Sequence, residues 1–410
     1  MKINLGLYMN ANRGYTGSGA LNPYAVRNIE QLLRLRDRTG QPLSNLNVET
    51  RLARDAAEHR RPTEDGMDTV AETHWVSARE FDPLKIHGQT MNGLVGNPVT
   101  TGDAKLLSAP ALESFVDKLR RRDRRGKNVL VLWGHADGPR GFLFSLVNKV
   151  RGRWGRDILS PLEVENALTK TGAGLDPLKF VCMDACQGAC LEFASILLPH
   201  ADFFIASQTP VPGSGWNYES WPAVLNEATN DWEATAIKIA NNFATSNPRN
   251  TSISVIRLDR ISTVLNQLRR VTLQFRENSS ARAQLLEARH AVPTYDKNLR
   301  GLVDFVALFN EAASRVAPQR LADECRALAA AMRDAIAASQ VSPDLSAQAP
   351  MSGCSIFFPT AESAFGEPWD EITSSIYFSD AAQLSLFKKT GWHELLKLLV
   401  PSVAQRPPRP

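Results

Sequence analysis

The sequence lacks long apolar runs. No stretch of the 410-residue chain approaches the roughly 18 uninterrupted apolar residues that a membrane-spanning helix needs. The opening residues, MKINLGLYMNANRGY, hold a short apolar stretch that Asn10 ends, so they also lack the apolar core and cleavage site of a signal peptide. We interpret them as a first strand and expect a cytoplasmic protein with no membrane partner.

A strong net charge is also missing. Lysine and arginine number 47 against 43 aspartates and glutamates, which gives a formal net charge of +4. For a chain of this size that charge is too mild to indicate nucleic acid as the main partner. With 43% hydrophobic and 22% charged residues, the composition is that of a soluble globular protein with one large domain or two.

Cysteine is scarce, and the five present are an odd number, which does not suggest a disulfide framework. Cys182, Cys186 and Cys190 follow one another at a spacing of four, so they could share one face of a helix. A zinc site would need CxxC pairs and matching histidines, which are absent. We therefore expect free thiols in a reducing cytoplasm and no metal site.

Two short apolar runs predict buried parallel strands. NVLVLWGHADG at 128–138 and LKFVCMDACQG at 178–188 are β-branched or aromatic and end in small or polar residues. The segment 160–171 between them predicts a helix with a first-turn proline and a capping box, formed by Ser160, Pro161 and Glu163. A strand, a helix and a second strand form a right-handed crossover.

With a third run at 201–218 and the opening strand at 2–9, at least four strands are expected. The predicted fold class is α/β, with a mostly parallel sheet covered by helices over residues 1–240. In such folds active sites lie beyond the carboxyl ends of the strands.

Beyond about residue 232 the pattern becomes helical, with strands returning at 252–258 and 353–360, the second of which is expected to rejoin a sheet. We expect a helix-rich part at 241–400 packed on the α/β domain, and a disordered tail at 401–410. The predicted helices are 231–245, 259–277, 281–290, 299–315 and 318–339.

His135 and Cys186 follow two strands that are expected to be neighbours. A cysteine attacks as its thiolate, and a free thiol near pKa ~8.5 is mostly neutral at pH 7 unless a neighbouring group favours ionisation. A histidine can do this and can protonate the leaving amine. Taken singly, the histidine could be a surface residue and the cysteine a small core residue. Their joint position favours catalysis.

Residues 184–188, DACQG, resemble the caspase signature, in which alanine, cysteine and glycine end the strand. WGHADG at 133–138, DACQGACLEFA at 184–194 and ASQTPVPGSGWNY at 206–218 are similar to motifs of clostripain-type cysteine peptidases. SGCSIFFP at 352–359 and TGWHELLKLL at 390–399 extend the resemblance over most of the chain.

This resemblance implies a caspase-like sheet sandwiched by helices, a Cys/His dyad, and cleavage of protein substrates after arginine or lysine. Cys186 would be the nucleophile and His135 the general base, with the backbone N–H groups of Ala136 and Cys186 holding the oxyanion. Asp184 would line the primary specificity pocket, where a carboxylate suits a guanidinium. Its alternative role is structural, as a hydrogen-bond acceptor for the adjacent loop. The substrate-binding set also includes Ser207 and Gln208.

Two positions depart from the family's pattern. Ala136 stands where glycine is usual, and Ser214 where relatives often carry an acidic residue. Glu219 or Asp137 could supply the missing negative charge. The resemblance implies no required cofactor and leaves calcium dependence open.

The segment LVNKVRGRWGRD at 146–157 is expected to be a basic loop that is cleaved on activation, by the enzyme itself or by an activating protease. A plain solvated loop and a phosphate-binding patch are its alternatives. The candidate cleavage residues are Lys149, Arg151, Arg153 and Arg156.

A regulatory protein is a further expected partner, and a bacterial defence or cell-death pathway is the family-level expectation. The rival to an enzyme is a caspase-like adaptor or scaffold that has kept the dyad without using it.

Overall fold

The computed structural model describes most of the chain. The described residues are 1–11, 21–33, 46–55, 61–63, 66–68, 71–77, 96–99, 107–139, 141–150, 153–172, 175–226, 231–294, 301–360 and 377–400. None of the helices in these ranges is long and apolar enough to cross a membrane. The tail predicted at 401–410 lies outside the described residues.

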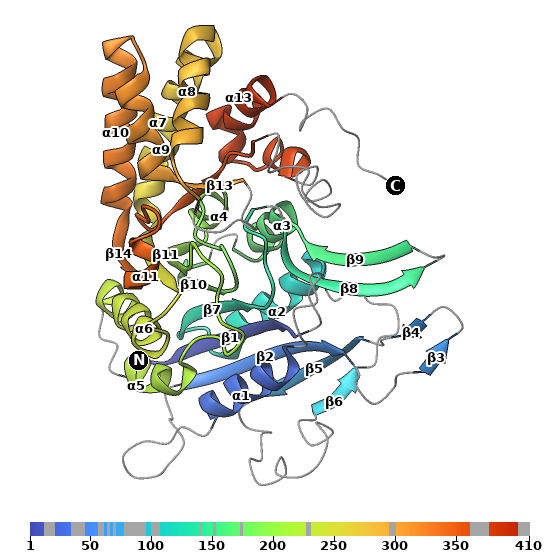
Figure 1. Ribbon diagram of the computed structural model, residues 1–410. Coiled ribbons are helices and arrows are strands. Elements are labelled where there is room, and N and C mark those ends of the chain that lie inside the picture. The colour runs from blue at the N-terminus through green and yellow to red at the C-terminus, as the bar shows by residue number, and fades with distance from the viewer. Residues whose placement is uncertain are drawn as a thin grey trace.

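A nine-stranded sheet forms the centre of the described structure (Figure 1). Its five middle strands run parallel, and each edge adds two antiparallel strands. In order, the strands are β14 (Ile336–Val341), β12 (Ser252–Arg257), β11 (Ala201–Ala206), β10 (Leu178–Asp184), β7 (Lys127–Trp133), β1 (Ile3–Asn10), β2 (Leu46–Asp55), β5 (Ala71–Ser77) and β6 (Gly96–Val99).

Three two-stranded sheets complete the β-structure of the described residues. β13 (Leu302–Asp304) pairs with β15 (Ser355–Phe357), and β3 (Arg61–Thr63) pairs with β4 (Gly66–Asp68). The third is a hairpin of β8 (Phe142–Val150) and β9 (Arg153–Leu159), which projects beyond the sheet in Figure 1.

Alternation along the middle strands divides the core into two layers. In β7, Val129 and Val131 face one layer while Leu130 and Leu132 face the other, as the period of two along a strand requires. The first layer is covered by α1 (Asn22–Leu33), α5 (Trp221–Asn226) and α6 (Trp232–Ser246). The short helix η3 (Tyr218–Ser220) directly precedes α5.

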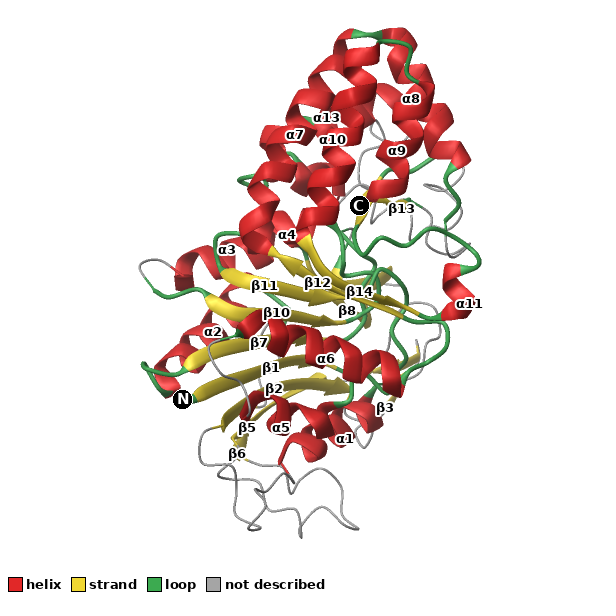
Figure 2. Ribbon diagram, turned by 90° about the vertical axis from the view of Figure 1, so that its left-hand side faces the viewer, coloured by secondary structure: helices red, strands yellow, loops and turns green. Residues whose placement is uncertain are grey.

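The second layer is larger and contains most of the helices. In Figure 2 several of these rise from the sheet as a helical stack. The helices of this layer are α2 (Ala109–Arg122), α3 (Pro161–Gly172), α4 (Leu191–Leu197), α7 (Leu258–Glu277), α8 (Ser279–Ala291), α9 (Phe305–Arg315), α10 (Gln319–Ala335), η4 (Phe387–Thr390) and α13 (Trp392–Leu399).

Most of the predicted elements are confirmed. The four expected strands are β1, β7, β10 and β11, and the expected α/β class with a parallel centre is observed. At the start of α3 the Ser160 amide donates to Glu163 Oε2 at 2.9 Å, and the Glu163 amide donates to Ser160 Oγ at 3.3 Å. This is the capping box that the sequence predicted.

The division at residue 240 does not separate two bodies, because the sheet continues across it. β12 and β14, both beyond that residue, extend the sheet of the first part. The helix predicted to reach residue 339 ends at Ala335, since residues 336–341 pair with β12 instead. The strand at 353–360 pairs with β13 and does not join the main sheet, and the helix predicted from 299 begins at Phe305.

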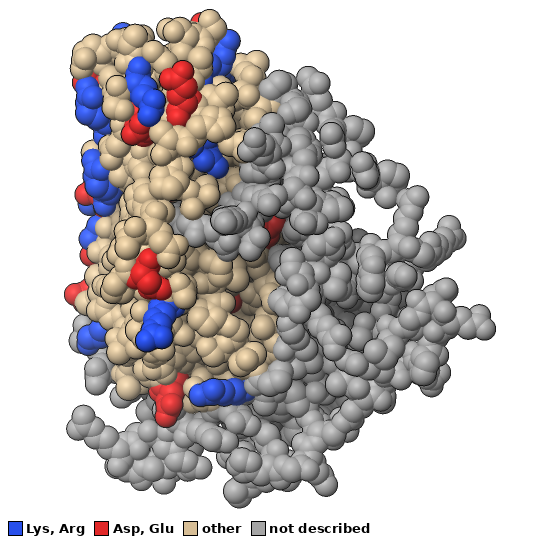
Figure 3. Space-filling view, viewed as in Figure 1, with Lys and Arg blue, Asp and Glu red and all other residues tan. Residues whose placement is uncertain are grey.

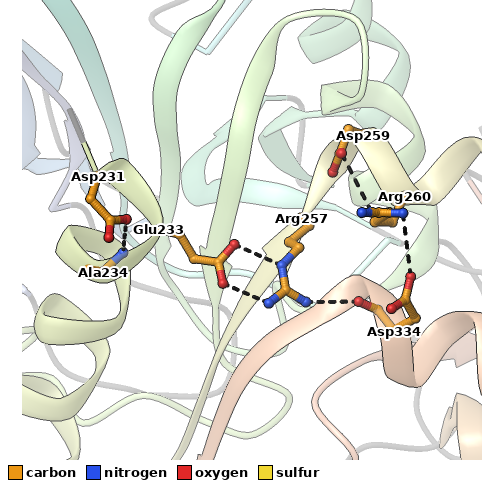
Figure 4. A network of polar contacts seen from close by, with 7 residues as sticks. All are labelled: Asp231, Glu233, Ala234, Arg257, Asp259, Arg260 and Asp334. Carbon is orange, nitrogen blue, oxygen red and sulfur yellow. Dashed lines mark hydrogen bonds and ion pairs between the residues drawn. The ribbon is translucent and has the colours of Figure 1, made fainter.

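Polar contacts also tie the two parts together. The Arg257 guanidinium donates to both carboxylate oxygens of Glu233, at 2.8 and 2.6 Å, and to the Asp334 carbonyl at 2.9 Å (Figure 4). Arg257 therefore joins the start of α6 to the end of α10. On the face seen in Figure 3, the basic and acidic side chains of the described residues are interspersed.

Candidate active site

The parallel pair β7 and β10 brings His135 and Cys186 to one edge of the sheet. Trp133 lies opposite Asp184 in the register, and His135 and Cys186 each follow two residues later. The Gly134 amide donates to the Asp184 carbonyl at 3.1 Å, which extends the pairing past the last strand residues. Because neighbouring strands lie ~4.8 Å apart, the imidazole and the thiol come from adjacent strand ends.

The cysteine loop is held against the loop that follows β11. Cys186 is partly exposed, whereas the other four cysteines are buried. The Val211 amide donates to Cys186 Sγ at 3.4 Å, and the Gln187 amide donates to the Thr209 carbonyl at 3.1 Å. Gln187 adopts the left-handed conformation with φ 58°. The Cys186 thiol is thus in contact with the backbone of Val211.

Burial determines the protonation states of His135 and Cys186. Desolvation lowers the pKa of His135 to about 4. Burial raises the pKa of the Cys186 thiol; the Val211 N–H opposes that rise, and the charges of Asp184 and Asp137 add to it. Both groups are therefore neutral at pH 7 in this conformation. A neutral imidazole is ready to accept a proton, as a general base must be.

Asp184 follows the strand into the core and is only 3% exposed. Its Oδ2 accepts from the Trp216 amide at 3.0 Å and from the Tyr218 hydroxyl at 2.8 Å. Burial raises the pKa of Asp184 to about 7, although these donors and the Trp133 indole lower it. The carboxylate therefore organises the loop after β11, which is the contact that its structural alternative requires.

The side chains of Ser207 and Gln208 point into the protein, and their assignment to substrate binding stays a prediction. Both are fully buried. Ser207 Oγ accepts from the Thr209 amide at 3.0 Å; Gln208 donates to Asp304 Oδ2 at 3.2 Å and accepts from the Gly353 amide at 2.7 Å. They fix the loop because buried polar groups must find partners inside the protein.

The other predicted residues lie around this edge. Ala136 forms an antiparallel bridge with Phe142, so the chain turns back directly after the histidine. Asp137 is buried, whereas Glu219 is exposed on η3. The oxyanion role of the Ala136 and Cys186 amides stays a prediction.

Cys182 lies in strand β10, whereas Cys190 precedes helix α4, and the two belong to opposite core layers. They cannot share one helix face with Cys186. Within the described ranges, no group of three His, Cys, Asp or Glu side chains is placed to hold a metal ion.

The segment 146–157 is not a loop but the outer part of the β8–β9 hairpin, with Val147 opposite Gly155. Lys149 lies in β8, and Arg153 and Arg156 lie in β9. Arg151 lies outside the described residues. Alternation in both strands is weak in the sequence, which explains why the hairpin was missed.

Sequence reasoning also missed two kinds of contact. The Val211 amide acts through its backbone, for which the sequence carries no signal. Trp216 and Tyr218 belong to the WNY motif that carried part of the resemblance. Their aromatic type at the end of a glycine loop was the available signal for partners of Asp184.

Comparisons with known proteins agree with this fold. A sequence model of the Clostripain family matches residues 95–398. No curated protein matches the chain.

Two solved structures from Bacteroides thetaiotaomicron are similar. One is a secreted C11 cysteine protease in complex with an irreversible peptide inhibitor, with 16% identity, a TM-score of 0.55, and coverage of 96% of this chain and 99% of that one. The other, the secreted C11 cysteine protease "iotapain", has 13% identity, a TM-score of 0.53 and coverage of 95% and 99%.

An inactive zymogen C11 protease from Parabacteroides distasonis is similar as well. It has 16% identity and a TM-score of 0.57, and the match covers 95% of this chain and 99% of that one. At these identities the structures share the fold.

The resting protonation state predicts how Cys186 reacts with iodoacetamide. Because the pKa of Cys186 is raised and that of His135 is lowered to about 4, the thiolate fraction should grow about tenfold for each pH unit between pH 6 and 8. Labelling rates followed by mass spectrometry, with Cys186→Ala as the blank, measure this slope. A rate that is flat from pH 5 to 8 would indicate a preformed thiolate–imidazolium pair and contradict the prediction.

Proposed function

Because the chain belongs to the clostripain family of cysteine peptidases, we propose that it cleaves peptide bonds after arginine or lysine, with Cys186 as nucleophile and His135 as general base. The observation that carries the proposal is the register of β7 and β10, in which both residues stand two positions past the paired Trp133 and Asp184. The partial exposure of Cys186, alone among the five cysteines, supports the same choice. An adaptor that does not use its dyad is disfavoured by this family membership.

In the proposed reaction Cys186 Sγ attacks the peptide carbonyl carbon while its proton passes to His135. The oxyanion accepts hydrogen bonds from the amides of Ala136 and Cys186. The imidazolium then gives its proton to the leaving amine, and a thioester remains on Cys186. Water, deprotonated by His135, hydrolyses this acyl-enzyme and restores the thiol.

Substitution of either dyad residue should abolish peptidase activity. Cys186→Ala and His135→Ala are each expected to lower kcat by about 10³-fold or more, since the two act as one unit. Cys182→Ala and Cys190→Ala, each in its own core layer, should retain substantial activity. Mass spectrometry of a peptide library after incubation with each variant gives the products. Identical fragments from wild type and Cys186→Ala would refute the nucleophile.

We propose that the Asp184 carboxylate binds the arginine or lysine side chain of the substrate. The Trp216 amide and the Tyr218 hydroxyl both donate to Oδ2 of its carboxylate, and the Trp133 indole is a further donor to the same group. A carboxylate held in this way is already oriented, so a cation that reaches it gains a charge-assisted bond without a cost of ordering.

Asp184→Asn should therefore lower kcat/KM for arginine and lysine peptides by about 10²-fold and leave neutral peptides less affected, because it keeps the shape and removes the charge. With a pKa of about 7, the wild type's preference for basic residues should strengthen from pH 6 to 8, as the carboxyl ionises. Tyr218→Phe is the matched control, because it removes one donor to Asp184 and keeps the carboxylate. A preference unchanged in Asp184→Asn would contradict the assignment.

We further propose that cleavage in the β8–β9 hairpin activates the chain. Two observations support a restrained starting state. The Val211 amide donates to Cys186 Sγ, and in chain order the hairpin follows the histidine strand and precedes α3 and the cysteine strand. A basic hairpin end suits an enzyme of basic specificity, whether the cut is made by a second copy or by another protease.

Replacement of Lys149, Arg151, Arg153 and Arg156 by alanine should block processing and keep activity low. In the wild type the two fragments should stay associated, because strands from both belong to one sheet. Gel analysis beside a fluorogenic peptide assay follows both quantities. The control replaces the exposed Arg121, Arg124 and Arg125, which removes positive charge elsewhere. Full activity of the uncut variant would overturn activation by cleavage.

The cellular setting is part of the proposal. Five free thiols support a reducing cytoplasm, whereas two of the similar proteins are described as secreted. A role in bacterial defence or cell death and a regulatory protein partner are further parts of this proposal.

A further inference from the structure

The loop after β11 rests on helix α1, which precedes the residues 95–398 matched by the family. Gly213 lies against the Tyr24 ring, where a Cβ would stand 3.2 Å from Tyr24 Cε2 and 3.6 Å from Leu21 Cδ2. The close contact places one turn of α1 beneath the loop that carries Trp216 and Tyr218, the partners of Asp184.

Asn28, one turn further along α1, is the polar centre of this contact. It is 1% exposed. Its Oδ1 accepts from the Trp133 indole at 3.1 Å, and its Nδ2 donates to the Ser214 carbonyl at 3.1 Å. Trp133 is the strand residue two positions before His135, so one amide side chain joins the histidine strand to the loop.

Gly215 shows how tightly these groups converge. A Cβ at this residue would stand 2.8 Å from Asn28 Oδ1, 2.8 Å from Asp184 Oδ2 and 3.0 Å from Trp133 Nε1. The backbone there has φ 68°, which favours glycine. The loop therefore passes directly over the Asn28 and Asp184 oxygens, and a small displacement of it would change the space beside the carboxylate.

We propose that Asn28 is a positioning residue for substrate specificity: it holds the 213–216 loop against the strand end and so sets the space that receives the substrate side chain before the scissile bond. The proposal rests on the proposed function only in placing that side chain near Asp184. Asn28 acts through Ser214 and Trp133 and does not itself touch the substrate.

The position of Asn28 distinguishes this role from a general contribution to stability. Asn4 offers the comparison, because it is also a fully buried asparagine and donates at 2.9 Å to both the Asp123 carbonyl and Asn128 Oδ1. Asn4 lies at the amino end of β1, on the far edge of the sheet from Cys186. Loss of either amide should cost comparable stability, and only loss of Asn28 should disturb the loop.

The experiment compares Asn28→Ala, Asn28→Asp and Asn4→Ala, all in the full chain. A peptide library that varies the residue before the scissile bond gives the selectivity of each, and urea unfolding gives its stability. Asn28→Ala should change the ratio of kcat/KM between the best and the neutral residue about tenfold, chiefly through KM. Asn4→Ala should leave that ratio within about twofold at a similar loss of stability.

Asn28→Asp is a second test of the proposal, and it replaces Asn28→Ala if that variant does not fold. It keeps an acceptor for the Trp133 indole and loses the donor to the Ser214 carbonyl, so selectivity should change while the rate of Cys186 labelling by iodoacetamide stays that of wild type.

An unchanged selectivity in Asn28→Asp, or an equal change in Asn4→Ala, would overturn the proposal. A wild type without a basic preference would instead refute the proposed specificity, which is seen in its own profile whatever the Asn28 variants do.

Discussion

The hydrogen bond from the Gly134 amide to the Asp184 carbonyl is the contact on which the catalytic end of the sheet depends. It carries the parallel ladder of β7 and β10 one step beyond the last paired residues, so that the two chains leave the sheet in register. Gly134 has φ 148°, and a Cβ there would stand 2.7 Å from the Asn10 carbonyl oxygen of the neighbouring strand. Only glycine fits this close approach, which explains the glycine directly after β7.

The alternation of side chains decides what surrounds this edge. Asp184 shares its face of β10 with Phe180 and Cys182, which belong to the layer covered by α1, α5 and α6. Its carboxylate can therefore be satisfied only from that side, and the donors come from Trp216 and Tyr218. A buried carboxyl group needs such donors, because desolvation without them would keep it neutral. One side chain thus connects the strand that precedes Cys186 with the loop that carries Trp216 and Tyr218.

The sequence contained most of the fold and the centre of the site. Strands that are buried on both faces, such as Val129–Trp133 in β7, are near-continuous apolar runs and are easily recognised, and the capping box at Ser160 is a local signal. β14 was missed because IAASQV continues the alanine-rich pattern of α10, and its pairing with β12 overrides that local preference. The burial of Gln208 was not predictable, because a polar residue after a strand can face either solvent or a buried network, and that choice depends on distant partners such as Asp304.

The loop between Gly213 and Gly215 has unequal freedom along its length. Gly215 has no room for a side chain, whereas a Cβ at Gly213 would meet the Tyr24 ring at 3.2 Å and require only that this exposed side chain shift. Ser214, between them, is held through its backbone carbonyl by Asn28, and that bond does not depend on which side chain the residue carries. Mutational drift can therefore accumulate at this one position while the loop keeps its path. An acidic residue and a serine could therefore both occupy this position without a change in the path of the loop.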